Sequence, residues 1–411
     1  MTVVIVNDFA FVNGGAGQVA VTTAKLLAKK GHHVVFFSAV GPIGQELKDV
    51  KNLSVICLNQ KDILRDPNRL RAVIQGVWNF RAAKAFSSLL SDCSPSDTLI
   101  HIHALSKSIS SSIVPVAKRK GFRIIYHLHD YGIVCPNLGF YDYQKEEICS
   151  RKAMSISCIM HHCDSRSILH KGWRVLRQFV QYRFGGIPND IDNIIYISEF
   201  SRRILEPYFA KGQRLDFLPN LIDVKRVERV QAEKNDVFLF IGRFAPEKAA
   251  GLFAQAAVRL SIPAVFIGAG ECESELRRIC PAAEFPGWLS HEEMESYFSR
   301  ARAFVFPSKL YEGQPLTVLE ALSHGIPAIV SDVCAARDEI LEGETGLLFK
   351  SGSLDSLCGQ IEKLKDDTLV SRFSEKAYRT YWEREYDEDS YVLRLEDIYR
   401  NTLSGLSKAW N

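Results

Sequence analysis

Short runs of β-branched and aromatic residues alternate with segments of helical periodicity along the whole chain. Strands of a parallel sheet are covered on both faces, so they read as nearly continuous apolar runs. The runs that fit this description are Val3–Val6, Val34–Phe37, Ser54–Leu58, Thr98–His101, Ile124–His127, Ile194–Ile197, Val237–Ile241, Ala264–Ile267, Ala303–Phe306 and Ala328–Val330. The alternation predicts an α/β protein with parallel sheets and crossover helices.

A polar stretch near the middle of the chain divides this pattern in two. The charged residues that follow Pro219 show no strand pattern, and 411 residues are too many for one ordinary core. We predict a Rossmann-like N-terminal domain (1–218), a linker (219–235) and a Rossmann-like C-terminal domain (236–384). A last helix, at about 385–411, is expected to pack back on the first domain.

Charge is distributed unevenly between the two halves. Residues 1–220 carry 28 Lys and Arg against 17 Asp and Glu, whereas the remainder carries 23 against 31. A basic half suits an anionic partner, such as nucleic acid, an anionic membrane or a phosphorylated substrate, although uneven surface charge alone explains it equally well. No run of 18 apolar residues is present, and the start lacks the charged region of a signal peptide. These features predict a cytoplasmic protein.

One segment of the second half combines a turn, a helix start and two carboxylates. It follows the strand that ends at Phe306 and reads Ser308-Lys309-Leu310-Tyr311-Glu312-Gly313-Gln314-Pro315-Leu316-Thr317-Val318-Leu319-Glu320-Ala321-Leu322. Proline suits the first turn of a helix, so Pro315 marks the helix start. The N–H groups of Leu316, Thr317 and Val318 would then be free at the positive end of the helix dipole. Such a helix start binds phosphate or diphosphate readily.

The two glutamates in this segment carry a family resemblance. Glu312 and Glu320, with the Ala-Leu-x-x-Gly-x-Pro run that ends at Pro327, resemble the signature of the retaining glycosyltransferase family 4. The resemblance implies the GT-B fold, in which two Rossmann-like domains face each other across a cleft. It also implies that Glu320 holds the ribose of a nucleotide-sugar donor and that Glu312 lies beside the donor sugar.

A second segment places two cations just beyond a strand end. Gly242-Arg243-Phe244-Ala245-Pro246-Glu247-Lys248 follows the strand Val237–Ile241. Glycine permits close backbone approach, and ligands bind at strand ends in such sheets. Arg243 and Lys248 can stabilise a departing diphosphate without a metal. The segment is similar to the family's diphosphate clamp, although Ala249 stands where the family often has Gly or Asn. In the same family, a turn like the one at Gly270 lines the base pocket.

Two features of the first half match the family more loosely. The loop Asn13-Gly14-Gly15-Ala16-Gly17-Gln18 opens a helix over about Gln18–Lys30, without the spacing of a dinucleotide-binding G-x-G-x-x-G. The resemblance implies that Gly14, Gly15 and Gly17 approach the donor phosphates. His129 follows the strand Ile124–His127, where an imidazole can donate to a sugar hydroxyl or carry a proton. The alternative is a core histidine held by Asp130.

Two other groups of residues suggest metal sites. Cys135, Cys149, Cys158 and Cys163 have the ligand type of a structural zinc site, but their spacing is not a paired C-x-x-C. Reduced cysteines in an insertion loop are the alternative. Asp190-Ile191-Asp192 resembles the metal-binding D-x-D of the other major glycosyltransferase fold, and we interpret it as a surface turn. We expect no metal in catalysis.

A basic amphipathic helix is predicted over residues 171–183. Its apolar stripe includes Trp173, Leu176 and Phe179, with lysine and arginine beside it. Such a helix suits an anionic membrane surface, whereas an ordinary helix docked by its stripe is the alternative.

Together these features predict a retaining, metal-independent hexosyltransferase that needs no cofactor. The expected donor is a nucleotide-diphosphate sugar, and the expected acceptor is a glycan or lipid-linked glycan in surface polysaccharide biosynthesis. The protein would work in the cytoplasm or at the inner face of the cell membrane. A GT-B-fold nucleotide-sugar epimerase or phosphorylase remains an alternative. A nucleic-acid-binding protein would use the basic half, but the sequence lacks a recognition motif with interleaved aromatics, so no nucleic-acid partner is expected.

Overall fold

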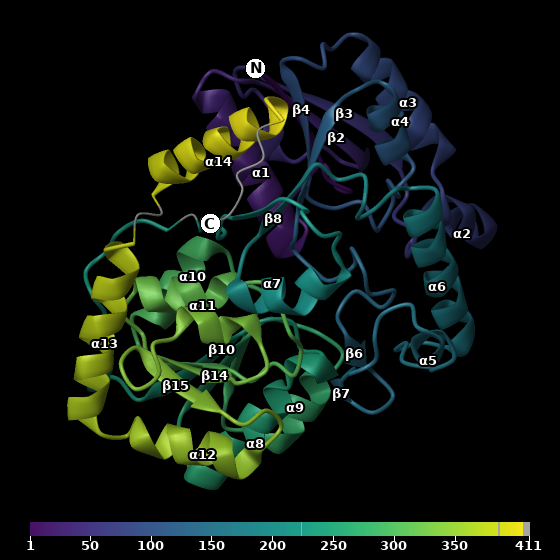
Figure 1. Ribbon diagram of the computed structural model, residues 1–411. Helices are drawn as coiled ribbons and strands as arrows, with labels where there is room; N and C mark the ends of the chain where they lie inside the picture. Colours follow the sequence, from purple (N-terminus) through teal and green to yellow (C-terminus); the bar gives the residue numbers. More distant parts are fainter. Residues whose placement is uncertain (223, 385–386, 406–411) are drawn as a thin grey trace. The chain divides into compact units, whose positions relative to one another are not determined.

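The computed structural model describes residues 1–222, 224–384 and 387–405, and contacts divide the chain into two compact units (Figure 1). Unit 1 comprises residues 1–139 and 150–221 together with the C-terminal helix α14 (Glu388–Leu403). Unit 2 comprises residues 140–149 and the described residues from 222 to 384. Residues 385, 386 and 406–411 of the expected last helix lie outside the described residues. No helix in the described ranges has the length and apolar character needed to span a membrane.

Unit 1 is built on a seven-stranded parallel sheet in the order β3-β2-β1-β4-β5-β8-β9. Its strands are β1 (Thr2–Val6), β2 (His33–Val40), β3 (Leu53–Gln60), β4 (Thr98–Ile102), β5 (Arg123–His127), β8 (Asn193–Tyr196) and β9 (Leu215–Phe217). Its helices, besides α14, are α1 (Gly14–Lys29), α2 (Arg69–Val77), α3 (Phe80–Ser91), α4 (Ile113–Arg119), α5 (Ile156–Ile159), α6 (Ile168–Arg183) and α7 (Glu199–Leu205), with 3₁₀ turns at Gln45–Leu47 and Glu206–Tyr208.

Helix α14 is part of the core of unit 1. It lies beside α1 in Figure 1, and its Tyr391, Leu395 and Tyr399 are buried in one cluster with β1 and α1. The Tyr391 hydroxyl lies 3.1 Å from the Thr23 hydroxyl, which ties the two helices by a buried hydrogen bond. The last described helix is therefore as much a core element of unit 1 as the first.

Unit 2 has a six-stranded parallel sheet in the order β12-β11-β10-β13-β14-β15. The strands are β10 (Val237–Ile241), β11 (Ala264–Ile267), β12 (Glu284–Gly287), β13 (Ala301–Phe306), β14 (Ala328–Ser331) and β15 (Gly346–Phe349). The helices are α8 (Ala250–Leu260), α9 (Glu273–Ile279), α10 (His291–Phe298), α11 (Leu316–Ser323), α12 (Leu354–Lys363) and α13 (Asp367–Trp382), with 3₁₀ turns at Ala232–Lys234, Pro246–Lys248 and Ala335–Glu339. A two-stranded antiparallel hairpin, β6 (Tyr141–Asp142) and β7 (Glu147–Ile148), also belongs to this unit.

The central strands explain why the apolar runs are continuous. Phe238 and Phe240 of β10 pack on one face with α8, α9 and α12, whereas Leu239 and Ile241 pack on the other face with α10 and α11. Both faces of the strand are buried, as in a doubly wound sheet. The predicted fold class and the predicted strands are confirmed.

The structure also differs from the expected elements at several points. Helix α1 begins at Gly14 rather than near Gln18, so the glycine loop forms its first turn. The sequence pattern missed the short edge strands β9, β12 and β15, and it missed the hairpin that joins unit 2 from within the first half of the chain. These edge strands are only three or four residues long, and a run this short gives a weak signal in the sequence.

Candidate active site

Two loops of unit 2 meet at the point where the strand order of its sheet reverses. The chain runs outward from β10 to β11 and β12, then returns to β13 on the other side of β10. Ligands bind at the carboxyl ends of the strands at such a point. The loop after β10 carries Lys248 and the loop after β13 carries Glu312, and their Nζ and Oε1 atoms lie 2.6 Å apart. The structure therefore brings together two residues that the sequence separates by 63 others.

The environment of Glu312 is constrained. Its Oε1 also accepts a hydrogen bond from the Ser308 hydroxyl at 2.5 Å, and its backbone has a φ of 53°, in the left-handed region. A glutamate in this region costs energy and occurs mainly where a site requires it. The Lys248 ammonium lies 5.8 Å from the centre of the Phe306 ring, at the end of β13. Lys248 and Glu312 are each about one-fifth exposed or less, so their charges are only partly screened.

Arg243, the other predicted cation, pairs within its own loop. Its Nη2 donates to Oε1 of Glu247 at 2.5 Å, and Glu247 is buried while Arg243 is 58% exposed. The loop turns at Ala249, whose φ of 52° is left-handed. Glycine and asparagine tolerate this conformation best, which is a physical reason for the residues common at this place in the family. Arg243 and Lys248 thus stand on one short loop, each beside a carboxylate.

Helix α11 begins next to these side chains without a side-chain cap at Pro315. The first N–H groups of a helix have no acceptor inside it, so the amides of Leu316 and Thr317 can bind an anion. The expectation for Val318 was wrong, because its N–H donates to the Pro315 carbonyl at 3.2 Å. The tight first turn uses this third amide internally, so the helix offers two free amides and not three.

Glu320 lies in the second turn of the same helix and is only 6% exposed. Its Oε2 is buried and has no hydrogen-bond partner in the described part of the chain. Burial raises the pKa of Glu320, while the charges of His291 and His324 oppose this effect. A buried carboxylate oxygen without a donor is costly, and a hydroxyl group of a ligand would satisfy it. A ribose presents such hydroxyls.

Glycine at position 270 allows the loop after β11 to pack closely against the loop after β10. A Cβ at Gly270 would lie 2.3 Å from the Phe244 carbonyl oxygen, so only glycine fits there. This packing lets the Phe244 N–H donate to the Ala269 carbonyl at 2.9 Å. Gly242 has ordinary space around its Cβ position, so its place at the end of β10 remains the argument for a ligand role.

In unit 1 the glycine loop also follows a strand at a reversal of strand order, between β1 and β4. Gly14 and Gly15 are exposed, Gly17 is buried, and all three lie in the first turn of α1. Asn13 precedes the helix without capping it. A side-chain cap is present at the start of α2, α3, α6, α7, α10, α12, α13 and α14. It is absent at the start of α1, α4, α8, α9 and α11. The start of α1 is therefore open to an anion.

His129 belongs to a stack of four histidines at the carboxyl ends of β4 and β5. Its Nε2 lies 2.9 Å from Nδ1 of His103, and the rings of His103, His127 and His129 pack 4.4–5.1 Å apart between centroids. Desolvation lowers the pKa of His129 to about 3. A neutral imidazole at this place suits hydrogen bonding to a sugar hydroxyl better than it suits acid catalysis. His129 is half-buried, so its hydrogen-bond role is combined with a place in the core.

The neighbouring histidines have unused nitrogens. Among the described residues, His101, His103 and His127 form the one group of potential ligands whose atoms all lie within 4.8 Å of one another. His101 Nδ1 lies 2.6 Å from the Tyr399 hydroxyl, and both nitrogens of His127 lack a partner. These are the residues of unit 1 that could hold a transition metal.

The predicted zinc cysteines surround a lysine. The Lys171 ammonium, fully buried on α6, lies 3.2 Å from the Cys163 sulfur and 3.8 Å from the Cys158 sulfur. Cys149 belongs to unit 2. A structural zinc site formed by the four cysteines stays a prediction, with Lys171 as the cation that the structure places beside these sulfurs. Asp192 pairs with Lys118 and Arg123 at 3.0 and 2.8 Å and its side chain is 11% exposed, so it has a structural role, whereas the interpretation of a surface turn stays a prediction.

Several contributors to the site were not expected from the sequence. Glu247 and Ser308 hold Arg243 and Glu312, and Lys309 pairs with Glu146 of the hairpin at 3.0 Å. The four-residue spacing of Arg243 and Glu247 was the available signal for the first pair. The contact with Glu146 had no signal, because it joins residues 163 positions apart.

Helix α6 reverses the expected use of its two faces. Its buried residues are polar, namely Lys171, Arg177, Gln178 and Gln181. Leu176 and Phe179, from the predicted apolar stripe, are 51% and 52% exposed. The docked-stripe alternative is thus wrong for these two residues, whose apolar surface faces solvent.

Solved structures with the same architecture define the class of this fold. Sucrose-phosphate synthase from Thermosynechococcus elongatus aligns with a TM-score of 0.73 at 18% identity, covering 98% of this chain and 100% of that one. HepE of Anabaena, solved in complex with UDP, aligns with a TM-score of 0.66 at 15% identity, covering 99% and 100%. At these identities the likeness shows the fold, which is GT-B.

The family follows from matches to known sequences. Residues 13–226 match the family described as Glycosyltransferase Family 4, and residues 222–380 match Glycosyl transferases group 1. The chain belongs to glycosyltransferase family 4. This membership favours the glycosyltransferase prediction over the epimerase, phosphorylase and nucleic-acid alternatives.

Curated relatives in this family are distant. A GDP-mannose-dependent monoacylated alpha-(1-6)-phosphatidylinositol monomannoside mannosyltransferase of Corynebacterium glutamicum is 24% identical over 243 residues, 52% of this chain and 64% of that protein. A UDP-Gal:alpha-D-GlcNAc-diphosphoundecaprenol alpha-1,3-galactosyltransferase of Escherichia coli is 25% identical over 225 residues, 47% of this chain and 56% of that protein. The chain thus spans less than two thirds of the length of these relatives.

Proposed function

We propose that this protein is a retaining glycosyltransferase that moves a hexose from a nucleotide-diphosphate sugar to a glycan or lipid-linked acceptor. The observation that carries the proposal is the paired Lys248 and Glu312 beside the uncapped start of α11, with the unpartnered carboxylate of Glu320 in the same helix. Cations, free amides and a hydroxyl acceptor together complement a nucleoside diphosphate.

Each residue has a role that its position supports. Lys248, Arg243 and the amides of Leu316 and Thr317 would bind the diphosphate and stabilise the charge that develops on it when the sugar departs. Glu320 would accept hydrogen bonds from the ribose hydroxyls, and Glu312 would lie beside the sugar. The protein's own cations would carry the leaving-group charge that a divalent metal carries in other enzymes.

In unit 1, Gly14, Gly15 and Gly17 would contact the donor phosphates. His129 would contact the sugar. The first turn of α1 offers backbone amides, and the neutral imidazole of His129 offers a hydrogen bond to a hydroxyl. Retention of the anomeric configuration follows the family, and no side chain of this site is proposed as a covalent nucleophile.

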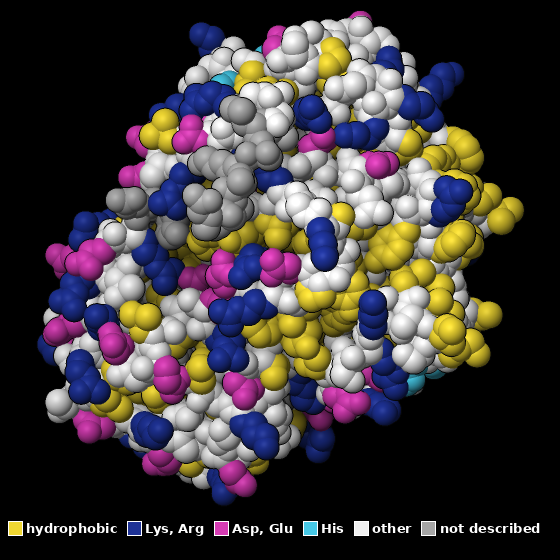
Figure 2. Space-filling model, viewed as in Figure 1, with side chains coloured by type: hydrophobic (Ala, Val, Ile, Leu, Met, Phe, Trp, Pro, Cys, Tyr) yellow, Lys and Arg dark blue, Asp and Glu magenta, His cyan; other side chains and the backbone are white. Residues whose placement is uncertain are grey.

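The acceptor is proposed to be lipid-linked, and the protein to work at a membrane surface. Unit 1 exposes large apolar side chains on three neighbouring elements, which appear together in the space-filling view (Figure 2). They are Leu70, Val73 and Ile74 on α2, Ile156 and Ile159 on α5 with Met160 directly after it, and Ile168, Leu169, Leu176 and Phe179 on α6. An exposed apolar patch of this kind on a basic half suits an anionic membrane. The two relatives described above have names that specify lipid-linked acceptors, which supports the same proposal.

The test is calorimetric titration of UDP, GDP and ADP in the presence of EDTA. We expect one nucleotide to bind, and Lys248→Ala to weaken its binding at least tenfold, since a hydrogen bond to a charged group contributes about 1.5–3 kcal/mol. Lys363→Ala, an exposed lysine of α12, is the matched control and should bind as wild type does. Binding that is absent for all three nucleotides, or that survives in Lys248→Ala, would contradict the donor site.

A further inference from the structure

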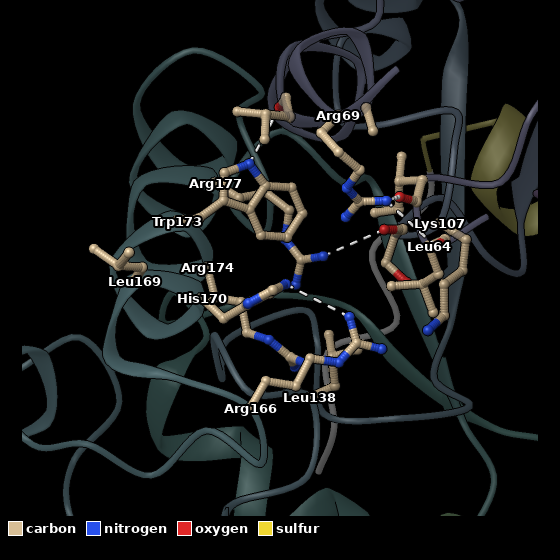
Figure 3. A pocket seen from close by; sticks show the side chains of 14 residues that line it. Leu64, Arg69, Lys107, Leu138, Arg166, Leu169, His170, Trp173, Arg174 and Arg177 are labelled. Carbon is tan, nitrogen blue, oxygen red and sulfur yellow. Dashed lines mark hydrogen bonds between the residues drawn. The ribbon is translucent and has the colours of Figure 1, made fainter. Parts of the chain in front are cut away.

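A cavity of about 260 Å³ opens in unit 1 between α2, α6 and the loop that follows β4 (Figure 3). The proposed transfer chemistry uses none of its lining residues. They are Ile63, Leu64, Arg69, Ala72, Val73, Ser106, Lys107, Leu138, Arg166, Leu169, His170, Trp173, Arg174 and Arg177. The wall thus combines cationic side chains with apolar ones and includes no carboxylate.

Within the part of the chain that the structure describes, most cations of the wall have no ion-pair partner, although the charges of Asp8 and Asp62 act on Lys107 and those of Asp8 and Asp130 act on Arg177. Five cationic side chains line the cavity. Among the described residues, Arg174 is the one of these five that forms an ion pair, with Asp164 at 2.7 Å. Arg69 donates instead to the carbonyl of Ile63 at 3.1 Å. The nearby Asp66 pairs with Arg71, which lies outside the cavity. An anion is therefore the complementary ligand.

Arg177 shows that the site is built into the fold. This arginine is 8% exposed, donates to the carbonyls of Ser106 and Pro136 at 3.2 and 3.3 Å, and lies 5.3 Å from the centre of the Trp173 ring. Burial lowers the pKa of Arg177 to about 10, with the charge of Arg174 acting in the same direction. The charges of Asp130 and Asp8 oppose this effect, but neither carboxylate forms an ion pair with Arg177 in the described part of the chain, so an anionic ligand would add the direct counter-charge that a buried guanidinium favours.

The opposite wall is held in place by a buried carboxylate. Asp8 accepts hydrogen bonds from the backbone N–H groups of Lys107, Ser108 and Ile109 at 2.7, 2.8 and 2.9 Å. These bonds fix the loop after β4, so Lys107 is presented to the cavity from a rigid backbone. The guanidinium groups of Arg69, Arg166 and Arg177 surround the same space in Figure 3.

The remaining wall is apolar and continues onto the surface. Ile63 and Ala72 are buried, whereas Val73 is 43% and Leu169 is 83% exposed. The cavity has room for many more atoms than a single water molecule. It holds a head group and a few carbons, so a longer chain would leave along the exposed apolar residues of α2 and α6.

We propose that this cavity binds the phosphate or diphosphate head of an amphiphile whose apolar chain follows the surface of α2 and α6. The inference rests on the proposed function, because such a ligand is the lipid carrier of the acceptor sugar. Arg69, Lys107, Arg166 and Arg177 hold the phosphate oxygens, and Trp173 and Val73 contact the first carbons of the chain.

The test is calorimetric binding of farnesyl diphosphate to the full chain without an affinity tag. Farnesol carries only the apolar chain and inorganic pyrophosphate carries only the charged group, so both serve as comparison ligands. We expect farnesyl diphosphate to bind at least tenfold more tightly than either. Arg69→Gln and Arg177→Gln should weaken this binding at least tenfold, and Leu169→Glu should do the same by placing a negative charge at the opening.

Two controls separate this inference from the proposed function. Arg119→Gln, on the exposed surface of α4, should bind farnesyl diphosphate as wild type does, and all variants should keep their nucleotide affinity. Leu169 is so exposed that its variant tests the site even if Arg177→Gln does not fold. The inference is overturned if pyrophosphate binds as tightly as farnesyl diphosphate, if neither binds while the nucleotide does, or if Leu169→Glu binds normally.

Discussion

At the scale of single residues, the proposed donor site of unit 2 is balanced in charge before any ligand binds. Arg243 and Lys248 each contact a glutamate, so the four side chains sum to zero. A diphosphate that bound at the proposed site would compete with Glu312 for Lys248, and the amides of α11 would supply part of the attraction. This arrangement couples the position of Glu312 to the presence of the leaving group.

Glu320 gives a prediction in which stability and binding change in opposite directions. Burial raises the pKa of Glu320, so the folded state holds the carboxyl proton more tightly than the unfolded state does. The free energy of unfolding therefore falls as the pH rises through the raised pKa of Glu320. Glu320→Gln removes that titration. At pH 8 it should melt a few degrees above wild type, since 1 kcal/mol corresponds to roughly 2–4 °C in units of this size, and it should bind nucleotide more weakly.

The measurement is thermal unfolding from pH 5 to pH 8 at constant ionic strength. Glu375→Gln, an exposed glutamate of α13, is the matched control and should follow the wild-type curve. A Glu320→Gln protein that is less stable than wild type throughout this range would show that the carboxylate is satisfied inside the protein.

At the scale of elements, α6 has an interior face that is polar and an exterior face that is partly apolar. Its arginine and glutamine side chains donate to backbone carbonyls of the loop between β5 and β6, which explains why that face is buried. The apolar side chains outside have no such partner in the described unit. Burial in a lipid surface would remove them from water.

Replacing Leu176 and Phe179 together by serine should therefore weaken binding to vesicles that contain anionic lipid. Each side chain is about half exposed, so its insertion contributes roughly 1 kcal/mol, and the pair accounts for about 2 kcal/mol or more than a tenfold change. Vesicle sedimentation measures this change. Val258→Ser, an apolar side chain of α8 that is 51% exposed, is the control. Equal binding of the double variant and wild type would refute membrane contact by α6.

The sequence predicted the strands and the two ligand loops of unit 2 because each depends on local signals. Apolar runs, glycine turns and the Pro315 helix start are read within a few residues. The Val318 amide was assigned wrongly, since the difference between a free N–H and a 3₁₀ bond depends on one turn's geometry. The cavity beside Arg177, the exposed side of α6 and the contact of Lys309 with Glu146 were beyond prediction, because they join residues far apart in the chain.

At the scale of the whole molecule, two independent cores divide the chain into units of opposite charge. The cores of unit 2 draw on residues from Val230 to Tyr381, and the main core of unit 1 includes α14 from the far end of the sequence. The first 220 residues carry the excess of basic side chains. The anionic ligand proposed for each unit thus meets a separately stabilised fold.

Nucleotide should therefore stabilise unit 2 selectively. A ligand at 100 times its Kd adds about 2.7 kcal/mol to the state that binds it. Hydrogen exchange followed by mass spectrometry should show slower exchange in β10, β13 and α11 when the nucleotide is present. The strands β2 and β3 of unit 1 should exchange as before, because their amides depend on the other core. Equal protection of both sheets would mean that the two units unfold as one. Lys248→Ala should abolish the slowing of exchange by nucleotide in either case.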